Sequence, residues 1–143
     1  MTSLAVHGTC VAINGKAVLI TGSPGSGKSS IALQLIDRGA ILVADDQTLI
    51  TYTEGQLVAH PPQTIQGLLE VRGVGLISYP FQEKSPLVLS VEICDDDSYE
   101  RLPEPTFIAY YESRIPLLKL MRGDPLGAIK IELKLSQEDD SHA

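Results

Sequence analysis

The sequence predicts an α/β fold with a mixed sheet, and three observations lead to this class. Short apolar runs of strand length alternate with turn signals along most of the chain. One of these runs leads directly into a glycine-rich loop and an amphipathic helix, an order typical of α/β proteins. The length of 143 residues, with 43% apolar and 20% charged residues, fits one domain with its own core. We therefore expect residues 1–143 to form a single domain.

The composition also excludes several classes of protein. No apolar run approaches the roughly 20 residues of a membrane helix, and the N-terminus carries no export signal, so we expect a cytoplasmic protein without a membrane span. The net charge of −7 disfavours nucleic acid and anionic lipid as partners. Only Cys10 and Cys94 occur, which argues against a disulfide framework or a structural zinc site.

The first predicted element is a β-hairpin around Asn14-Gly15. The pair separates the apolar runs Thr9–Ile13 and Ala17–Thr21, and Asn-Gly is the favoured sequence of a two-residue type I′ turn. Such a turn pairs the residues on either side of it, and each further pair moves one residue outward, which places His7 opposite Gly22. A histidine at a strand start is usually an exposed bystander, but this register brings His7 to the glycine-rich loop.

That loop matches the Walker A pattern G-x-x-x-x-G-K-[ST] and follows a predicted strand, as a P-loop does. Its backbone amides would surround a phosphate, Lys28 would reach the terminal phosphates of a nucleotide, and the Ser29 hydroxyl would bind Mg²⁺. The alternative is a glycine-rich turn that binds nothing. The candidate nucleotide-binding residues are Gly22, Ser23, Pro24, Gly25, Ser26, Gly27, Lys28 and Ser29.

A helix and a buried strand follow the loop. Apolar residues recur four apart within Ser30–Arg38, and Gly39 is expected to end the helix. The short apolar run Ala40–Ala44 then reads as a strand, so we expect a right-handed βαβ unit whose two strands pair in parallel.

Two adjacent carboxylates, Asp45 and Asp46, end that strand at the edge of the sheet where α/β proteins collect ligands. One can contact Mg²⁺ or its waters while the other acts as a base on an alcohol or water. They can also be solvated loop residues or a helix cap.

The remaining chain carries weaker signals. Glu70 and Arg72 would share one face of a strand, as a surface ion pair or as a metal ligand beside a phosphate clamp, and the spacing alone favours the ion pair. Arg101 reads by itself as an exposed loop residue. Residues 128–135 fit either a strand or a helix, and 136–143 are expected to be a disordered tail. Further strands are expected at Thr48–Tyr52, Leu57–Ala59, Leu87–Cys94, Phe107–Tyr111 and Ile115–Leu120.

Five motifs occur in a characteristic order. They are HG (residues 7–8), GSPGSGKS (22–29), LVADD (42–46), LLEVRGVGLI (68–77) and YERL (99–102). Together they resemble the catalytic, C-terminal domain of HPr kinase/phosphorylase over roughly residues 4–135, in a short form without the N-terminal domain. The resemblance implies a P-loop α/β core similar to that of phosphoenolpyruvate carboxykinase. It also implies a hexameric kinase that uses ATP and Mg²⁺ to phosphorylate a serine of the phosphocarrier protein HPr in phosphotransferase-system signalling.

The resemblance also implies roles for single residues. Lys28 and its loop match the nucleotide site, and Ser29 with Glu70 match the Mg²⁺ ligands. His7 matches a catalytic histidine, and Arg101 matches an arginine that holds phosphate. The base is assigned first to Asp46 and second to Asp45.

Two departures limit the expected activity. Ser30 stands where the family usually has glutamate, which removes one carboxylate near the metal. Residues 121–125 are a poor counterpart of the Pro-Gly-Arg-Asn loop associated with dephosphorylation, so the resemblance does not extend to phosphorylase activity. The alternative function is a nucleotide-binding sensor or scaffold that transfers no phosphate. A signalling GTPase is disfavoured because Asn14, the only asparagine, cannot supply its Asn-Lys-x-Asp motif.

Overall fold

The computed structural model describes residues 3–95 and 104–141, with side chains up to residue 138. Its described elements are eleven strands, two α-helices and one 3₁₀ turn. The strands are β1 (Leu4–His7), β2 (Thr9–Ile13), β3 (Lys16–Gly22), β4 (Ile41–Ala44), β5 (Gln47–Thr53), β6 (Gln56–His60), β7 (Leu68–Val71), β8 (Gly75–Ser78), β9 (Ser85–Cys94), β10 (Thr106–Tyr110) and β11 (Ser113–Met121). The helices are α1 (Lys28–Asp37) and α2 (Gly127–Ser141), and the 3₁₀ turn η1 is Gln63–Ile65.

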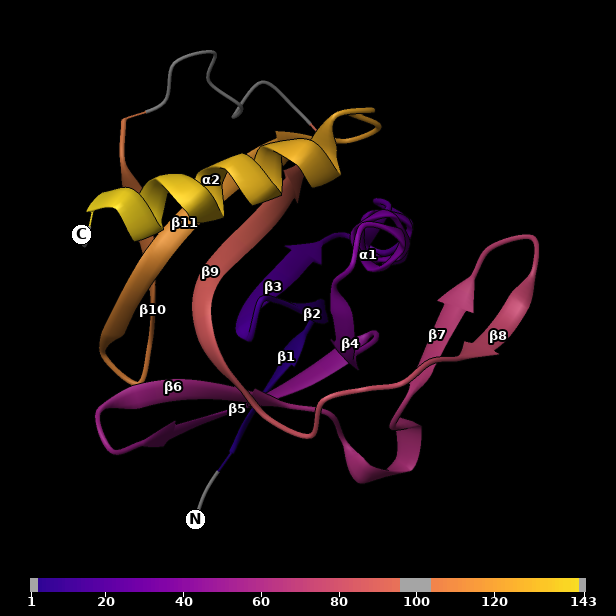
Figure 1. Ribbon diagram of the computed structural model, residues 1–143, viewed down its shortest axis with the longest axis horizontal. Coiled ribbons are helices and arrows are strands. Elements are labelled where there is room, and N and C mark those ends of the chain that lie inside the picture. Colours follow the sequence, from indigo (N-terminus) through magenta and orange to yellow (C-terminus); the bar gives the residue numbers. More distant parts are fainter. Residues whose placement is uncertain (1–2, 96–103, 142–143) are drawn as a thin grey trace.

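Nine strands form one mixed sheet with β9 at its centre. The first residues of β9 pair with β6, and its later residues lie between β3 and β11, both parallel to it. Figure 1 shows β9 curving through the middle of the molecule with α2 lying across it and β11. One core cluster contains buried residues of both helices, and a second is built from strands alone, with buried residues of β2, β3, β4, β5, β6, β9, β10 and β11. The expected mixed α/β architecture is therefore confirmed.

The hairpin predicted around Asn14-Gly15 is present. Ile13 pairs with Lys16 across Asn14-Gly15, whose φ angles of 50° and 79° are those of a type I′ turn. The second hairpin, β5–β6, turns in the same way at Glu54-Gly55, with φ angles of 52° and 78°.

The predicted position of His7 is wrong. The β2–β3 register holds as far as Thr9, opposite Ile20, and the chain then leaves this ladder at Gly8. The Gly8 N–H donates to the Asp46 carbonyl at 3.0 Å, so the chain crosses over and β1 pairs with β5. His7 consequently lies opposite Gln47 rather than Gly22.

We expect Gly8→Ala to lower the free energy of unfolding by about 1–3 kcal/mol because the site is overpacked. A Cβ atom at Gly8 would lie 2.8 Å from the Ile20 carbonyl oxygen and 2.9 Å from Leu19 Cδ1. Urea denaturation measures the change. Gly127→Ala in α2 is the control, since its nearest contact would be 3.4 Å and alanine favours a helix. Equal stability of Gly8→Ala and the wild type would contradict this expectation.

The expected parallel pairing of the strands around α1 is also wrong. β4 pairs with β2 in antiparallel fashion, so it runs in the direction of β3 but is separated from it by β2. Both edges of β3 are already taken, by β2 on one side and β9 on the other. The carboxyl ends of β3, β4, β9 and β11 nevertheless all face the same edge of the sheet.

α1 ends where the sequence predicts, whereas α2 is longer than expected. α1 stops where expected, since Gly39 has a φ of 112° and the N–H groups of Gly39 and Ala40 close a Schellman motif on Ile36 and Leu35. Residues 128–135, whose sequence fits either a strand or a helix, belong to α2. The helix continues to Ser141, so residues 136–141 are helical instead of an irregular tail. No helix in the described ranges is long and apolar enough to cross a membrane.

The glycine-spaced segment after η1 forms a separate two-stranded hairpin, β7–β8. It projects from the main sheet, as Figure 1 shows. The buried side chain of Leu69 attaches it to the core beneath the helices.

Asp124 precedes α2, and we expect its substitution to change the pH dependence of stability. A hydrogen bond from Lys130 is the main cause that lowers the pKa of Asp124 below its usual value, and the N–H of Leu126 adds to it. Because the folded-state pKa is depressed, the stabilisation is present above the unfolded-state pKa and is lost as the pH falls through the folded one. Asp124→Asn should therefore lose less stability than the wild type between about pH 5 and pH 2 in urea titrations. Equal losses in the two proteins would exclude this role.

Candidate active site

The glycine loop, defined as residues 22–29, connects the carboxyl end of β3 to the first turn of α1. Gly25 and Gly27 have φ angles of 78° and 105°, which other residues rarely adopt. Lys28 folds back over the loop, and its Nζ donates to the carbonyls of Gly22 and Ser23 at 3.0 Å each. The amine therefore lies against the loop backbone.

The loop fits an anion such as a phosphate. No side chain caps the N-terminus of α1, and no acidic residue lies in its first turn, so the helix presents open N–H groups and its positive dipole end. Ser26 is only 4% exposed, and its buried hydroxyl has no hydrogen-bond partner among the residues that the structure describes. A buried hydroxyl of this kind is costly unless a ligand or water satisfies it.

Asp45 joins four segments of the chain at this edge. The residue is 7% exposed, and its Oδ1 accepts hydrogen bonds from the hydroxyls of Ser29 at 2.8 Å and Thr9 at 2.9 Å. Its Oδ2 accepts the backbone N–H of Glu70 at 2.9 Å. The pairing of carboxylate with the Ser29 hydroxyl supplies oxygen ligands of the type that Mg²⁺ prefers.

Asp46 has a different environment from its neighbour. It is exposed, with a φ of 66°, and within the described part of the chain no hydrogen bond holds its carboxylate. Its carbonyl receives the Gly8 N–H, so it lies next to His7, which is also exposed. The structure thus brings His7 to the aspartate pair by a different route from the predicted register. The Asp45 carboxylate is therefore fixed by hydrogen bonds, whereas the Asp46 carboxylate is open to solvent.

Glu70 reaches the site through its backbone, since its N–H binds Asp45 while its side chain is exposed. β7 ends at Val71, which places Arg72 in the hairpin turn. The surface ion pair expected between Glu70 and Arg72 is absent from the described residues. Arg101 lies outside the residues that the structure describes.

Sequence reasoning missed two residues that contact the glycine loop. Asp95 Oδ2 accepts the Ser23 hydroxyl at 2.9 Å, and Arg122 donates to the Gly25 carbonyl at 2.8 Å. The Arg122 guanidinium also binds Asp95 Oδ1 at 3.1 Å. Both residues directly follow strands parallel to β3, so the strand order would have indicated them.

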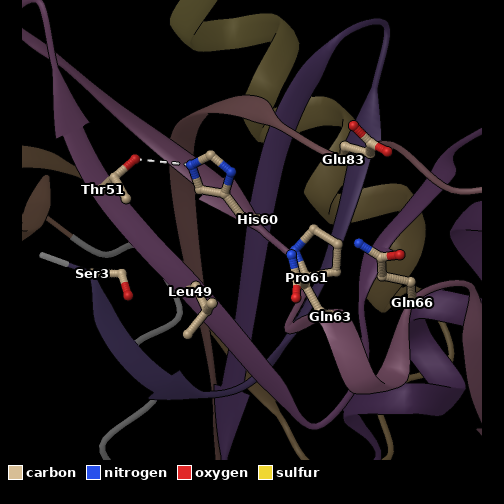
Figure 2. Close-up of a pocket in the computed structure, with 8 residues that line it drawn as sticks. All are labelled: Ser3, Leu49, Thr51, His60, Pro61, Gln63, Gln66 and Glu83. Carbon is tan, nitrogen blue, oxygen red and sulfur yellow. Dashed lines mark hydrogen bonds between the residues drawn. The ribbon is translucent and has the colours of Figure 1, made fainter. Parts of the chain in front are cut away.

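A cavity of about 350 Å³ lies on the β5–β6 hairpin, where His60 Nε2 and Thr51 Oγ1 are 2.9 Å apart (Figure 2). His60 is the last residue of β6. None of the lining residues belongs to the glycine loop or the aspartate pair, so this cavity is separate from the candidate site. They are Ser3, Leu49, Thr51, His60, Pro61, Gln63, Gln66 and Glu83.

Comparison with known proteins identifies the family. A sequence model described as the HPr Serine kinase C-terminal domain matches residues 1–84. This chain belongs to the HPr serine kinase family. The HPr kinase/phosphorylase of Clostridium beijerinckii is 44% identical over 107 residues, which cover 68% of this chain and 35% of that protein. For the Bordetella pertussis enzyme the identity is 44% over 109 residues, with the same coverage of 68% and 35%. The chain spans about a third of the length of these curated relatives.

The fold of the family extends over nearly the whole chain. The Hpr(Ser) kinase/phosphatase from Coxiella burnetii superposes with a TM-score of 0.86 at 23% sequence identity. The match covers 97% of this chain and 98% of that one. The resemblance to the HPr kinase family is therefore confirmed in sequence and in fold.

Proposed function

We propose that this chain is a kinase that uses ATP and Mg²⁺ to phosphorylate a serine of HPr. The observation that carries the proposal is the 2.8 Å hydrogen bond between Ser29 and the buried Asp45, at the start of a helix whose N-terminus is open to phosphate. Family membership of a chain with a glycine loop supports it. The expected nucleotide site is residues 22–29, a P-loop.

The chain's residues have distinct tasks in this proposal. Loop amides and the Lys28 ammonium bind the nucleotide's phosphates and stabilise the charge that develops on the transferred group. Ser29 and Asp45 would hold Mg²⁺, with Glu70 of the separate β7–β8 hairpin as a further ligand. Bound there, the ion would neutralise charge on the β- and γ-phosphates. No cluster of three metal-binding side chains occurs among the described residues, so phosphate oxygens would complete the coordination.

Asp46 is the proposed base. The acceptor serine loses its proton to the Asp46 carboxylate as its oxygen bonds to the γ-phosphorus, while the bond to the β–γ bridging oxygen breaks and ADP leaves. The exposure of Asp46 supports this role because a protein substrate must reach the base. His7, beside Asp46, and Arg101 are proposed to stabilise the transferring phosphoryl group.

A transfer assay tests the function. Purified protein is mixed with ATP labelled on the γ-phosphate, Mg²⁺ and HPr, and label on HPr is measured. An HPr variant with alanine at its acceptor serine is the control and should remain unlabelled. Nucleotide binding without any label on HPr would overturn the kinase proposal. That outcome would favour the sensor or scaffold that Ser30 suggests.

A further inference from the structure

The tip of the glycine loop is held by residues from two other strands. Asp95 follows β9 and Arg122 follows β11, and the two side chains form an ion pair of 3.1 Å. Each partner also makes one bond to the loop: Asp95 accepts the Ser23 hydroxyl, and Arg122 donates to the Gly25 carbonyl. We call these two residues the brace.

The brace acts on the part of the loop whose conformation decides whether amides can face a phosphate. The Ser26 N–H closes a turn on the Ser23 carbonyl at 3.1 Å. The Gly25 carbonyl, in the same peptide group as that N–H, is directed to the half-exposed guanidinium of Arg122. This hydrogen bond gives the Gly25 carbonyl oxygen a cationic partner, which offsets the repulsion that its partial negative charge would exert on an anion at the loop. The two brace contacts thus bind both ends of the Ser23–Ser26 turn.

An exposed ion pair by itself contributes little to stability. About half of each brace side chain is accessible, with values of 53% for Arg122 and 47% for Asp95. The effect of the brace is therefore local: it restricts a glycine-rich segment that would otherwise lose conformational freedom when a ligand binds. Both partners contribute hydrogen bonds with a charged group, the stronger class.

We propose that Asp95 and Arg122 are positioning residues that hold the glycine loop in its phosphate-accepting shape before the nucleotide arrives. The ligand in this inference rests on the proposed function; the effect on the loop does not. For one of the two residues, charge repulsion alone predicts the opposite change in nucleotide affinity. Asp95 places a negative charge beside a polyanion site, so without a positioning role its removal would strengthen nucleotide binding.

The first experiment measures the Kd of Mg²⁺-ATP by calorimetry. We expect Asp95→Ala to bind about tenfold more weakly than the wild type, as the loss of charge-assisted hydrogen bonds predicts. Ser23→Ala removes the same contact without changing charge and should weaken binding in the same direction. Asp37→Ala, at the far end of α1, removes an exposed carboxylate and is the matched control. Unchanged or tighter binding by Asp95→Ala would overturn the proposal.

The second experiment needs no nucleotide. Hydrogen exchange of the Ser26 amide should be slow in the wild type and faster in Asp95→Ala and in Arg122→Gln. The double variant should exchange no faster than either single variant, because the two residues act as a unit. If the Ser26 amide exchanges at the wild-type rate in both single variants, the proposed role of the brace is also overturned. If the wild type fails to bind ATP, the proposed function is wrong, and the exchange data still decide the role of the brace.

Discussion

Lys28→Ala is expected to reduce phosphoryl transfer to HPr by about 10³-fold or more, the upper range for loss of one strong stabilising group. The ammonium is the only charged side chain of the glycine loop and lies over it, 3.0 Å from two loop carbonyls. A bound triphosphate offers stronger acceptors, and the amine needs only a rotation of its flexible side chain to reach them. Because charge develops on the transferred group, kcat should fall as well as nucleotide affinity. The rate of labelled-phosphate transfer measures this loss.

The comparison variant for Lys28 must remove a lysine elsewhere. Lys84→Ala changes the net charge by the same amount at an exposed site before β9 and should transfer phosphate at the wild-type rate. Lys28→Arg keeps the charge but replaces a compact ammonium by a planar fork, so we expect it to remain strongly impaired. Transfer by Lys28→Ala within a few-fold of the wild type would rule out the assigned role.

Asp46→Asn is expected to lower kcat by about 10²–10⁴-fold while leaving the Kd of Mg²⁺-ATP nearly unchanged. The carboxylate makes no described contact with the glycine loop, so its loss should not disturb nucleotide binding. Asparagine tolerates the φ of 66° at this position and has nearly the same shape, which keeps the backbone in place. Single-turnover transfer and calorimetry separate the two quantities.

Asp45→Asn tests the order within the pair. Its carboxylate is buried and accepts three hydrogen bonds, so the substitution should weaken the Mg²⁺ dependence and lower the unfolding midpoint. If Asp46→Asn transfers phosphate at the wild-type rate while a folded Asp45→Asn does not, Asp45 is the base. Asp46 would then lie at the site without a chemical role.

Features set by neighbouring residues were predictable from the sequence. Asn14-Gly15 specifies its own turn, and the order of strand, glycine loop and helix around Lys28 follows from local spacing. Features set by distant segments were not. β4 pairs with β2 because β3 has no free edge, and His7 leaves its predicted register because Gly8 bonds to Asp46.

The ambiguous C-terminal segment and the site show the same limit. An alternating pattern and a helical pattern coexist in residues 128–135, and burial of Ala128, Ile131 and Leu135 on one face against the sheet selects the helix. The contact of Ser29 with Asp45 could be expected because both residues lie where strands end at the same edge of the sheet. Asp95 and Arg122 meet only because β9 and β11 are neighbours in the sheet. No spacing in the chain indicates that adjacency.

The three donors on Asp45 make one carboxylate a shared anchor for sequence-distant segments: the strand that starts at Thr9, the loop at Ser29 and the hairpin at Glu70. The proposed Mg²⁺ site and the packing of these three segments therefore depend on the same pair of oxygen atoms. The fold itself places no demand on the Asp46 carboxylate, since no contact in the described chain depends on it, so only its proposed role as the base constrains that side chain. A change at Asp45 has to be matched by coordinated changes in all three segments, which makes that position resistant to stepwise evolution.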